Sequence, residues 1–258
     1  ADFPDFLYAC GSYADAHDAG EAAHWPPWQA AAVNYIRKRP DFMSGNWSLD
    51  TQRLVAFLYG VSVHYASDEF WEGLSEKLSR AQGMTGLLAS FNLNQSGVGN
   101  QAENIANLGS DFFVSWALDE RSIKPWERYF PIHDIAEIYH SYSYGHNFSN
   151  VTVASLAECK ALFDLGLWAE KEFGKFIFHI WTEVVYKVPL ITEHVLDMPL
   201  CGIDDMSIWA SWVWERIARW LDDGPPSSPE PRKLASRAPP PKMDEADAWL
   251  RDFILALK

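Results

Sequence analysis

Three side chains able to bind a metal recur at four-residue intervals in one segment of the chain: His64, Asp68 and Glu72. Residues four apart in an α-helix lie over one another on one face, so the three would project along a single stripe. An imidazole and a carboxylate one turn apart can share a divalent cation, because zinc accepts both nitrogen and oxygen ligands. The spacing is therefore compatible with a metal site on a helix through these residues.

A second stripe with the same spacing follows, at Glu103, Asn107 and Asp111. Two such stripes that face each other inside a helical bundle form a polar cavity lined by carboxylates. The spacing by itself favours solvated helix faces, where such pairs are mildly stabilising. His64 lies within a strongly apolar run, and a buried charged row needs partners or a cation, which favours the metal site.

Further ligand candidates lie near the start of the chain, at Asp5, His17 and His24. The first 25 residues lack periodicity and are predicted to form an ordered loop. His24 precedes Trp25 and two prolines, which fix the backbone and make it the better ligand candidate. His17 is followed by Asp18 and is expected to be exposed. The remaining histidines show no paired spacing and are expected to be structural or exposed: His133, His140, His146, His179 and His194.

The elements that must position these side chains are predicted to be helices. Apolar periodicity and turn residues place them at about 28–39, 50–80, 101–119, 132–143, 152–186 and 204–222. The first of these helices ends at a break over residues 40–46, and Ser48 or Asp50 can cap the next. In that next helix, Leu54, Phe57, Leu58 and Val61 recur at the spacing of a buried face.

The composition changes abruptly at Gly224. Residues 224–243 are rich in proline and predict a semi-extended linker, and residues 244–258 predict a short amphipathic helix. The expected architecture is therefore an all-α, multi-helix bundle over residues 1–223, followed by a Pro-rich tail and a terminal helix.

Charge and composition exclude several classes of protein. Charged residues make up 22% of the 258, as expected for a globular chain, and the formal net charge of −14 argues against a nucleic-acid partner and against attraction to anionic lipid surfaces. The sequence contains no run of 18 apolar residues, so no transmembrane segment is predicted. Four Asn-x-Ser/Thr sequons favour a secreted glycoprotein. These sequons lie at Asn46, Asn94, Asn147 and Asn150. The chain has three cysteines, Cys10, Cys159 and Cys201, and their number leaves the disulfide pairing open.

Short motifs distributed over residues 3–223 point to one family. They are Phe3-Pro4-Asp5, His17-Asp18, His24-Trp25, Val33-Asn34-Tyr35-Ile36-Arg37, Leu54-Val55-Ala56-Phe57-Leu58-Tyr59-Gly60-Val61, Phe130-Pro131, Ile138-Tyr139, and Gly202-Ile203-Asp204-Asp205-Met206 with Trp209. Together they resemble the catalytic domain of the glycosylphosphatidylinositol-specific phospholipases D, a family of the zinc-dependent phospholipase C and fungal zinc-nuclease superfamily.

The resemblance implies an all-helical bundle whose cleft holds up to three zinc ions, which bind the phosphate of a lipid phosphodiester and activate a water. Its best preserved site has two carboxylates and two imidazoles, and it maps onto Asp5, His24, His64 and Asp68. These four residues would be both catalytic and metal-binding. The implied substrate is a lipid phosphodiester or a glycosylphosphatidylinositol head group, and the implied location is outside the cell.

A second metal site departs from the family pattern. Where the family carries another His, this chain has Glu72, and where it carries a His-x-x-x-acid pair, this chain has Glu103 and Asn107. Such an all-oxygen site is poorer for zinc and better suited to Ca²⁺ or Mg²⁺. The sequence therefore leaves two functions open: a metal-dependent phosphodiesterase, or a catalytically impaired secreted module that keeps one metal site. In the second case, residues 244–258 would dock on a protein partner.

Overall fold

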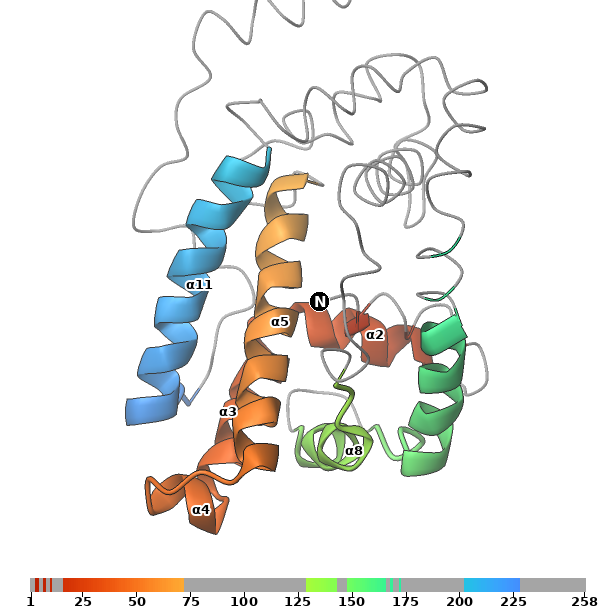
Figure 1. Cartoon of the computed structure of the whole chain (residues 1–258), viewed down its shortest axis with the longest axis horizontal. Helices are drawn as coiled ribbons and strands as arrows, with labels where there is room; N and C mark the ends of the chain where they lie inside the picture. The colour runs from red at the N-terminus through yellow and green to blue at the C-terminus, as the bar shows by residue number, and fades with distance from the viewer. Residues whose placement is uncertain are drawn as a thin grey trace, which may run out of the picture. The chain divides into compact units, whose positions relative to one another are not determined.

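The computed structural model describes residues 3–4, 7, 10, 16–71, 129–142, 148–165, 168, 172 and 202–227. These ranges contain helices and no strand, which confirms the all-α class. In chain order the helices are α2 (Ala16–His24), α3 (Pro26–Arg37), α4 (Pro40–Met43), α5 (Leu49–Trp71), α8 (Ile132–Ser141) and α11 (Ile203–Asp223), with a further helical segment at residues 153–165 between α8 and α11 (Figure 1).

The chain divides into two compact units. The first comprises Ala1–Tyr65, Ile123–Trp168 and Ala210–Lys233, and the second comprises Ala66–Ser122, Ala169–Trp209 and Leu234–Lys258. Most of the described residues belong to the first unit, to which the packing below refers. The Pro-rich linker and the terminal helix stay predictions, because residues beyond 227 lie outside the described ranges.

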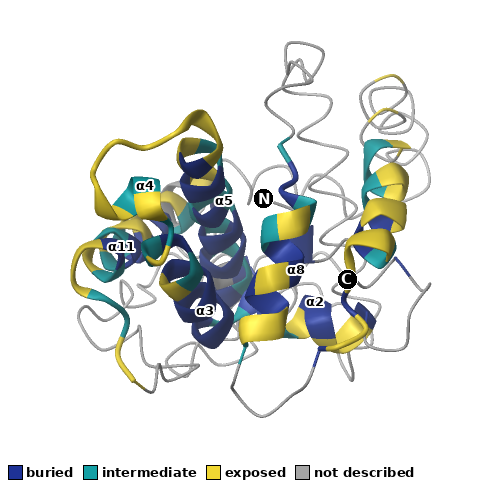
Figure 2. Ribbon diagram, turned by 90° about the horizontal axis from the view of Figure 1, so that it is seen from below, coloured by how far each residue is buried: buried dark blue, intermediate teal, exposed yellow. Residues whose placement is uncertain are grey.

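Helix α3 is the centre of the first unit and packs against α2, α4 and α8. Its first turn holds Pro26 and Pro27, where the missing N–H groups cost nothing, and a run of alanines follows. The small side chains let neighbouring helices approach closely. Figure 2 shows α3 buried along most of its length, whereas α2 and α8 each keep an exposed side.

Aromatic rings fill the core around α3. The ring of Phe3 lies 5.8 Å from that of Trp28 and 5.3 Å from those of Phe57 and Phe130. Aromatic pairs at such separations contribute about 0.5–1.5 kcal/mol each beyond the area that they bury. The cluster joins the start of the chain to α3, α5 and the segment before α8.

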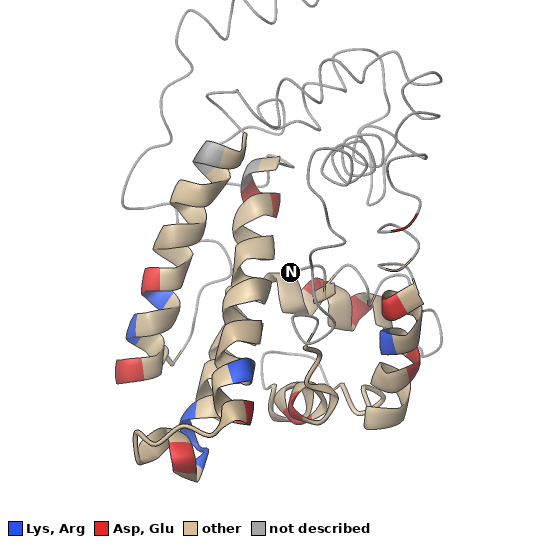
Figure 3. Cartoon of the chain, viewed as in Figure 1, with Lys and Arg blue, Asp and Glu red and all other residues tan. Residues whose placement is uncertain are grey.

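The buried face predicted for α5 is confirmed. Leu54, Leu58 and Val61 are each 1% exposed, and Phe57 contacts Phe3. No charged residue occurs on α5 between Arg53 and Asp68, as Figure 3 shows along the helix. The predicted start of this helix was accurate to one residue; its predicted end at residue 80 lies outside the described part of the chain.

The prediction of a loop over the first 25 residues was wrong, because Ala16–His24 form α2. Its buried face consists of Ala16, Ala19, Gly20 and Ala23, which recur at helical spacing but are too small to register as an apolar stripe. The predicted break at residues 40–46 likewise contains the single helical turn of α4, which begins at a proline.

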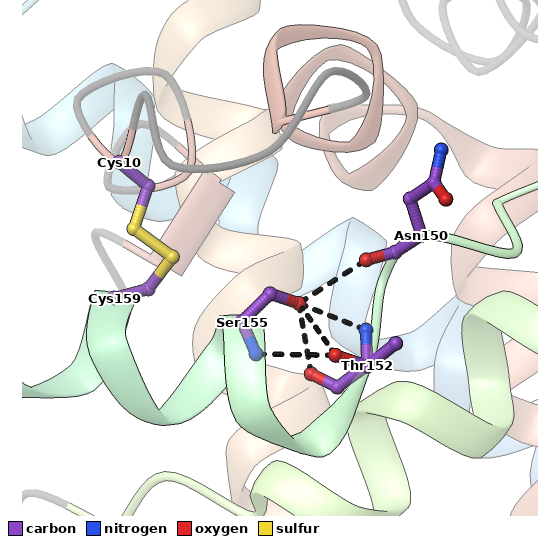
Figure 4. Close-up of a disulfide and its surroundings, with 5 residues drawn as sticks. All are labelled: Cys10, Asn150, Thr152, Ser155 and Cys159. Atoms are coloured by element: carbon purple, nitrogen blue, oxygen red, sulfur yellow. Dashed lines mark hydrogen bonds between the residues drawn. A yellow bond between two sulfur atoms is a disulfide. The ribbon is translucent and has the colours of Figure 1, made fainter.

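Two tertiary contacts fasten the ends of the described elements. Cys10 and Cys159, both buried, form a disulfide with a Cα–Cα distance of 5.3 Å, which settles the pairing for these two cysteines (Figure 4). Arg37 donates hydrogen bonds to the carbonyl oxygens of Trp220 and Leu221 in the last turn of α11. Gly224 then ends that helix with a φ of 94°, a conformation open to glycine at no steric cost.

Candidate metal centre

His24 is the last residue of α2 and is held from behind by its own helix. Its Nδ1 lies 2.8 Å from the carbonyl oxygen of Gly20, one turn earlier. Because a carbonyl oxygen only accepts hydrogen bonds, the proton resides on Nδ1, and a neutral His24 ring presents the lone pair of Nε2 on its other side. Metal-ligating histidines are oriented in the same way, by a carbonyl or carboxylate on the nitrogen that does not bind the metal.

His64, on α5, meets His24 at that nitrogen. The two Nε2 atoms are 3.1 Å apart, the ring centroids are 4.9 Å apart, and each residue is 9% exposed. The two residues are 40 positions apart in the chain, so only the tertiary fold brings the two rings together. The adjacent residues Trp25 and Tyr65 repeat the contact, with ring centroids 5.9 Å apart.

Asp68 lies one turn beyond His64 on the same uninterrupted helix, so α5 itself fixes the position of its carboxylate relative to the imidazole. His24, His64 and Asp68 each offer one ligand atom, and these atoms all lie within 4.8 Å of one another. The structure therefore brings together three of the four residues that the resemblance assigned to one site.

The three side chains fit zinc. Two nitrogen ligands at 2.0–2.1 Å from a tetrahedral zinc lie roughly 3.3 Å apart, close to the Nε2–Nε2 distance found here. Two imidazoles and a carboxylate also match the nitrogen and oxygen preference of this ion, and they leave one tetrahedral position for a fourth ligand or a water.

A hydrogen bond from α8 fixes the helix that carries His24. The hydroxyl of Tyr139 donates to the carbonyl oxygen of Ala19 at 2.6 Å. Tyr139 is 1% exposed, and its ring packs against Trp28 and Phe148. Ala19 directly precedes Gly20, whose carbonyl oxygen orients the His24 ring. The hydrogen bond from Tyr139 therefore holds α2 in place beside that carbonyl group.

Other candidates fall elsewhere. Asp5, Glu72 and Glu103 lie outside the described residues, as do Asn107 and Asp111. His17 pairs with Asp18 on the surface, with Nδ1 3.6 Å from a carboxylate oxygen and side chains 61% and 57% exposed. His133 and His140 are exposed on α8, as expected.

Sequence reasoning missed two residues near this centre. Glu69, next to Asp68, is a carboxylate that is only 4% exposed. In the sequence, Tyr139 stands out only as part of the motif Ile138-Tyr139. Neither has a spacing that could have revealed it, because the burial of Glu69 and the contact of Tyr139 with α2 both depend on tertiary packing.

The described part of the chain is helical and gathers His24, His64 and Asp68 from two helices, an arrangement from which helical proteins commonly build metal sites. The phosphatidylinositol-glycan-specific phospholipase D of Dictyostelium discoideum is 34% identical over 225 residues, which cover 86% of this chain and 21% of that protein. The Homo sapiens protein of the same name is 26% identical over 229 residues, 86% of this chain and 25% of the relative. No family model and no solved structure matches the chain.

The chain is therefore homologous to the phosphatidylinositol-glycan-specific phospholipases D over most of its length, which confirms the resemblance seen in its motifs. It spans about a quarter of the length of these curated relatives. Within the described residues, no helix has the length and apolar character needed to cross a bilayer.

Proposed function

We propose that this domain is a metal-dependent phosphodiesterase that acts on a lipid phosphodiester of the glycosylphosphatidylinositol type. The observation that carries the proposal is the buried imidazole pair, with two Nε2 atoms 3.1 Å apart and a carboxylate one turn away. The names of the relatives supply the substrate class. Zinc bound here would lower the pKa of a bound water and neutralise charge on the phosphate.

Three of the described side chains would supply ligands to that ion. His24, oriented by Gly20, and His64 would supply nitrogen ligands, and Asp68 an oxygen ligand that offsets part of the positive charge. Asp5 is the fourth predicted ligand. Val61 and Tyr65, which flank His64 in the sequence of α5, are each 1% exposed. A setting of low polarity strengthens electrostatic interactions at the site.

Extracellular action is part of the proposal. Disulfides persist in oxidising compartments, and the Cys10–Cys159 pair supports such a location. A second ion, at Glu72 and Glu103, would bind oxygen ligands and favour Ca²⁺ or Mg²⁺.

The test combines metal content with turnover. We expect at least one zinc per chain and chelator-sensitive release of a glycosylphosphatidylinositol-anchored protein. His24→Ala and His64→Ala should each lose the bound zinc and the release activity. His140→Ala, which removes an exposed histidine of α8, should keep the zinc and the activity. A chain that binds no zinc, or variants that leave turnover unchanged, would contradict the proposal.

A second function is favoured by the residues at the second site. Glu72, Glu103 and Asn107 stand where the family pattern has metal-binding histidines and an acid. A chain that keeps the first ion alone would be a secreted binding or assembly module. One zinc per chain, lost in His64→Ala, with no hydrolysis of lipid substrate or of bis-p-nitrophenyl phosphate would establish this function in place of the first.

A further inference from the structure

Two of the four sequons lie in the described part of the chain, and both occupy the same structural position. Asn46 and Asn150 are exposed, and each lies two residues before a hydroxyl residue that begins a helix. Ser48 precedes α5, which starts at Leu49, and Thr152 precedes the helical segment 153–165. In both sequons the hydroxyl that defines the motif is therefore also the N-cap of a helix.

At the first sequon the cap is tied to a carboxylate. The Ser48 hydroxyl donates to Asp41 Oδ2 at 2.6 Å and accepts the backbone N–H of Thr51 at 3.2 Å. The backbone N–H of Ser48 and the hydroxyl of Thr51 also donate to Asp41 Oδ2, at 2.9 and 2.7 Å. These hydrogen bonds lower the pKa of Asp41, the side-chain bond from Ser48 contributing most, so that the carboxylate stays charged.

At the second sequon the cap is reciprocal. The backbone N–H of Ser155 donates to Thr152 Oγ1 at 3.2 Å, and the backbone N–H of Thr152 donates to Ser155 Oγ at 2.8 Å (Figure 4). The Ser155 hydroxyl also lies 3.2 Å from the carbonyl oxygen of Asn150. In Figure 4 the side-chain amide of Asn150 points away from this cap. The arrangement has the reciprocal bonds of a capping box, with Ser155 in the place of the usual Glu or Gln, and it satisfies two backbone donors at a helix start.

We propose that Asn46 and Asn150 are N-glycosylation sites that are open to modification only before their helices are capped. In the transfer, Nδ2 of the asparagine attacks the anomeric carbon of a lipid-pyrophosphate-linked oligosaccharide. A carbon–nitrogen bond forms, the bond from that carbon to the pyrophosphate oxygen breaks, Nδ2 loses a proton, and the lipid pyrophosphate leaves.

The competition follows from the double use of one hydroxyl. The acceptor motif requires Ser or Thr two residues after the asparagine, so the transferring enzyme must contact that hydroxyl. In the folded chain the hydroxyl is already hydrogen-bonded and the next residue is helical. The enzyme would have to break the cap and unwind the first turn, whereas an unfolded chain presents both sequons freely. The exposed asparagines then leave room for a glycan after folding.

The experiment measures glycan transfer to the full chain from a host without N-glycosylation. Purified oligosaccharyltransferase and its lipid-linked donor are added to the native chain or to the reduced, unfolded chain, and occupancy at each asparagine is mapped by mass spectrometry. We expect transfer to Asn46 and Asn150 to be at least roughly tenfold slower in the native chain.

Crossed variants assign the effect to the caps. Ser155→Ala leaves the second sequon intact and removes the bond from the Thr152 N–H to the Ser155 hydroxyl, and should raise transfer to Asn150 in the native chain by roughly 5-fold, the factor that corresponds to one hydrogen bond. Asp41→Ala should do the same at Asn46. Each variant serves as the control for the other site, and its melting curve shows that it is folded.

Three results would overturn the proposal. Equal rates in native and unfolded chains would show that the caps do not limit transfer. Variants that change both sites equally, or neither, would show that the hydroxyls are not the cause. Absence of transfer even to the unfolded chain would exclude both asparagines as acceptors. None of these outcomes depends on the metal site.

Discussion

The imidazole pair and the two helix caps are built over different distances along the chain. His24, at the end of α2, and His64, on α5, are 40 residues apart and meet only in the folded chain. Ser48 and Thr152 bond to partners within ten residues, such as Asp41 and Ser155. The pair should therefore respond to any change that moves α2, whereas each cap should respond only to changes in its own turn.

The largest effect is expected at the pair. Zinc at about a thousand times its dissociation constant should stabilise the wild-type chain by roughly 4 kcal/mol, by mass action. His64→Ala should abolish this stabilisation, and Thr152→Ala should leave it intact. Melting curves with zinc and with a chelator measure the difference. A zinc-induced shift of equal size in His64→Ala would place the metal elsewhere in the chain.

A smaller effect on metal binding is expected at Tyr139. Tyr139→Phe removes the hydrogen bond to Ala19 and releases α2 beside Gly20, so zinc affinity should fall about tenfold, the lower end for residues that orient ligands. Tyr35→Phe is the matched control, because it removes a hydroxyl that also bonds across helices, to Asp134.

Both tyrosine variants should lose about 1 kcal/mol of unfolding free energy, the usual value of a hydrogen bond. Zinc competition with a fluorescent chelator separates them. Equal affinity losses in the two variants would mean that Tyr139 contributes only general stability and does not position His24.

The caps should contribute stability without affecting the pair. Thr152→Ala should lower the free energy of unfolding by about 1 kcal/mol, because it removes an N-cap. Asn150→Gln leaves the cap in place and should leave stability within about 0.5 kcal/mol of wild type. Urea unfolding of unglycosylated protein measures both. A larger loss in Asn150→Gln would mean that the asparagine side chain is the important member of the turn.

The smallest effect is a pH dependence at the first cap. Hydrogen bonds from Ser48 and Thr51 hold the pKa of Asp41 below its ordinary value of 3.8. Because the pKa of Asp41 is lower in the folded state, the charged carboxylate stabilises the fold above about pH 4. This stabilisation is lost as the pH falls below about 4 towards the folded-state pKa. Between pH 5 and pH 2, the melting temperature of Asp41→Asn should fall less than that of the wild type. Parallel curves would show that another carboxylate dominates acid unfolding.

Residues that act within one helix could be predicted from the chain alone. The face of α5 and the stacking of His64 over Asp68 depend on spacing within a helix, and the cap, predicted at Ser48 or Asp50 and found at Ser48, depends on bonds within ten residues. The helix α2 was missed, because an Ala and Gly stripe gives little hydrophobic contrast. The predicted second site, at Glu72 and Glu103, remains a prediction, since both residues lie outside the described ranges.

The sequence by itself determined the helical class, the His64 and Asp68 stripe and the kinship with the phosphatidylinositol-glycan-specific phospholipases D. Only the tertiary structure decided that His24 meets His64, that Cys10 pairs with Cys159 and that Tyr139 anchors α2. The physical reason is the separation along the chain of the residues that interact. Periodicity and capping involve neighbours along the chain, whereas these contacts join segments 40 to 149 residues apart and exist only once the helices have packed.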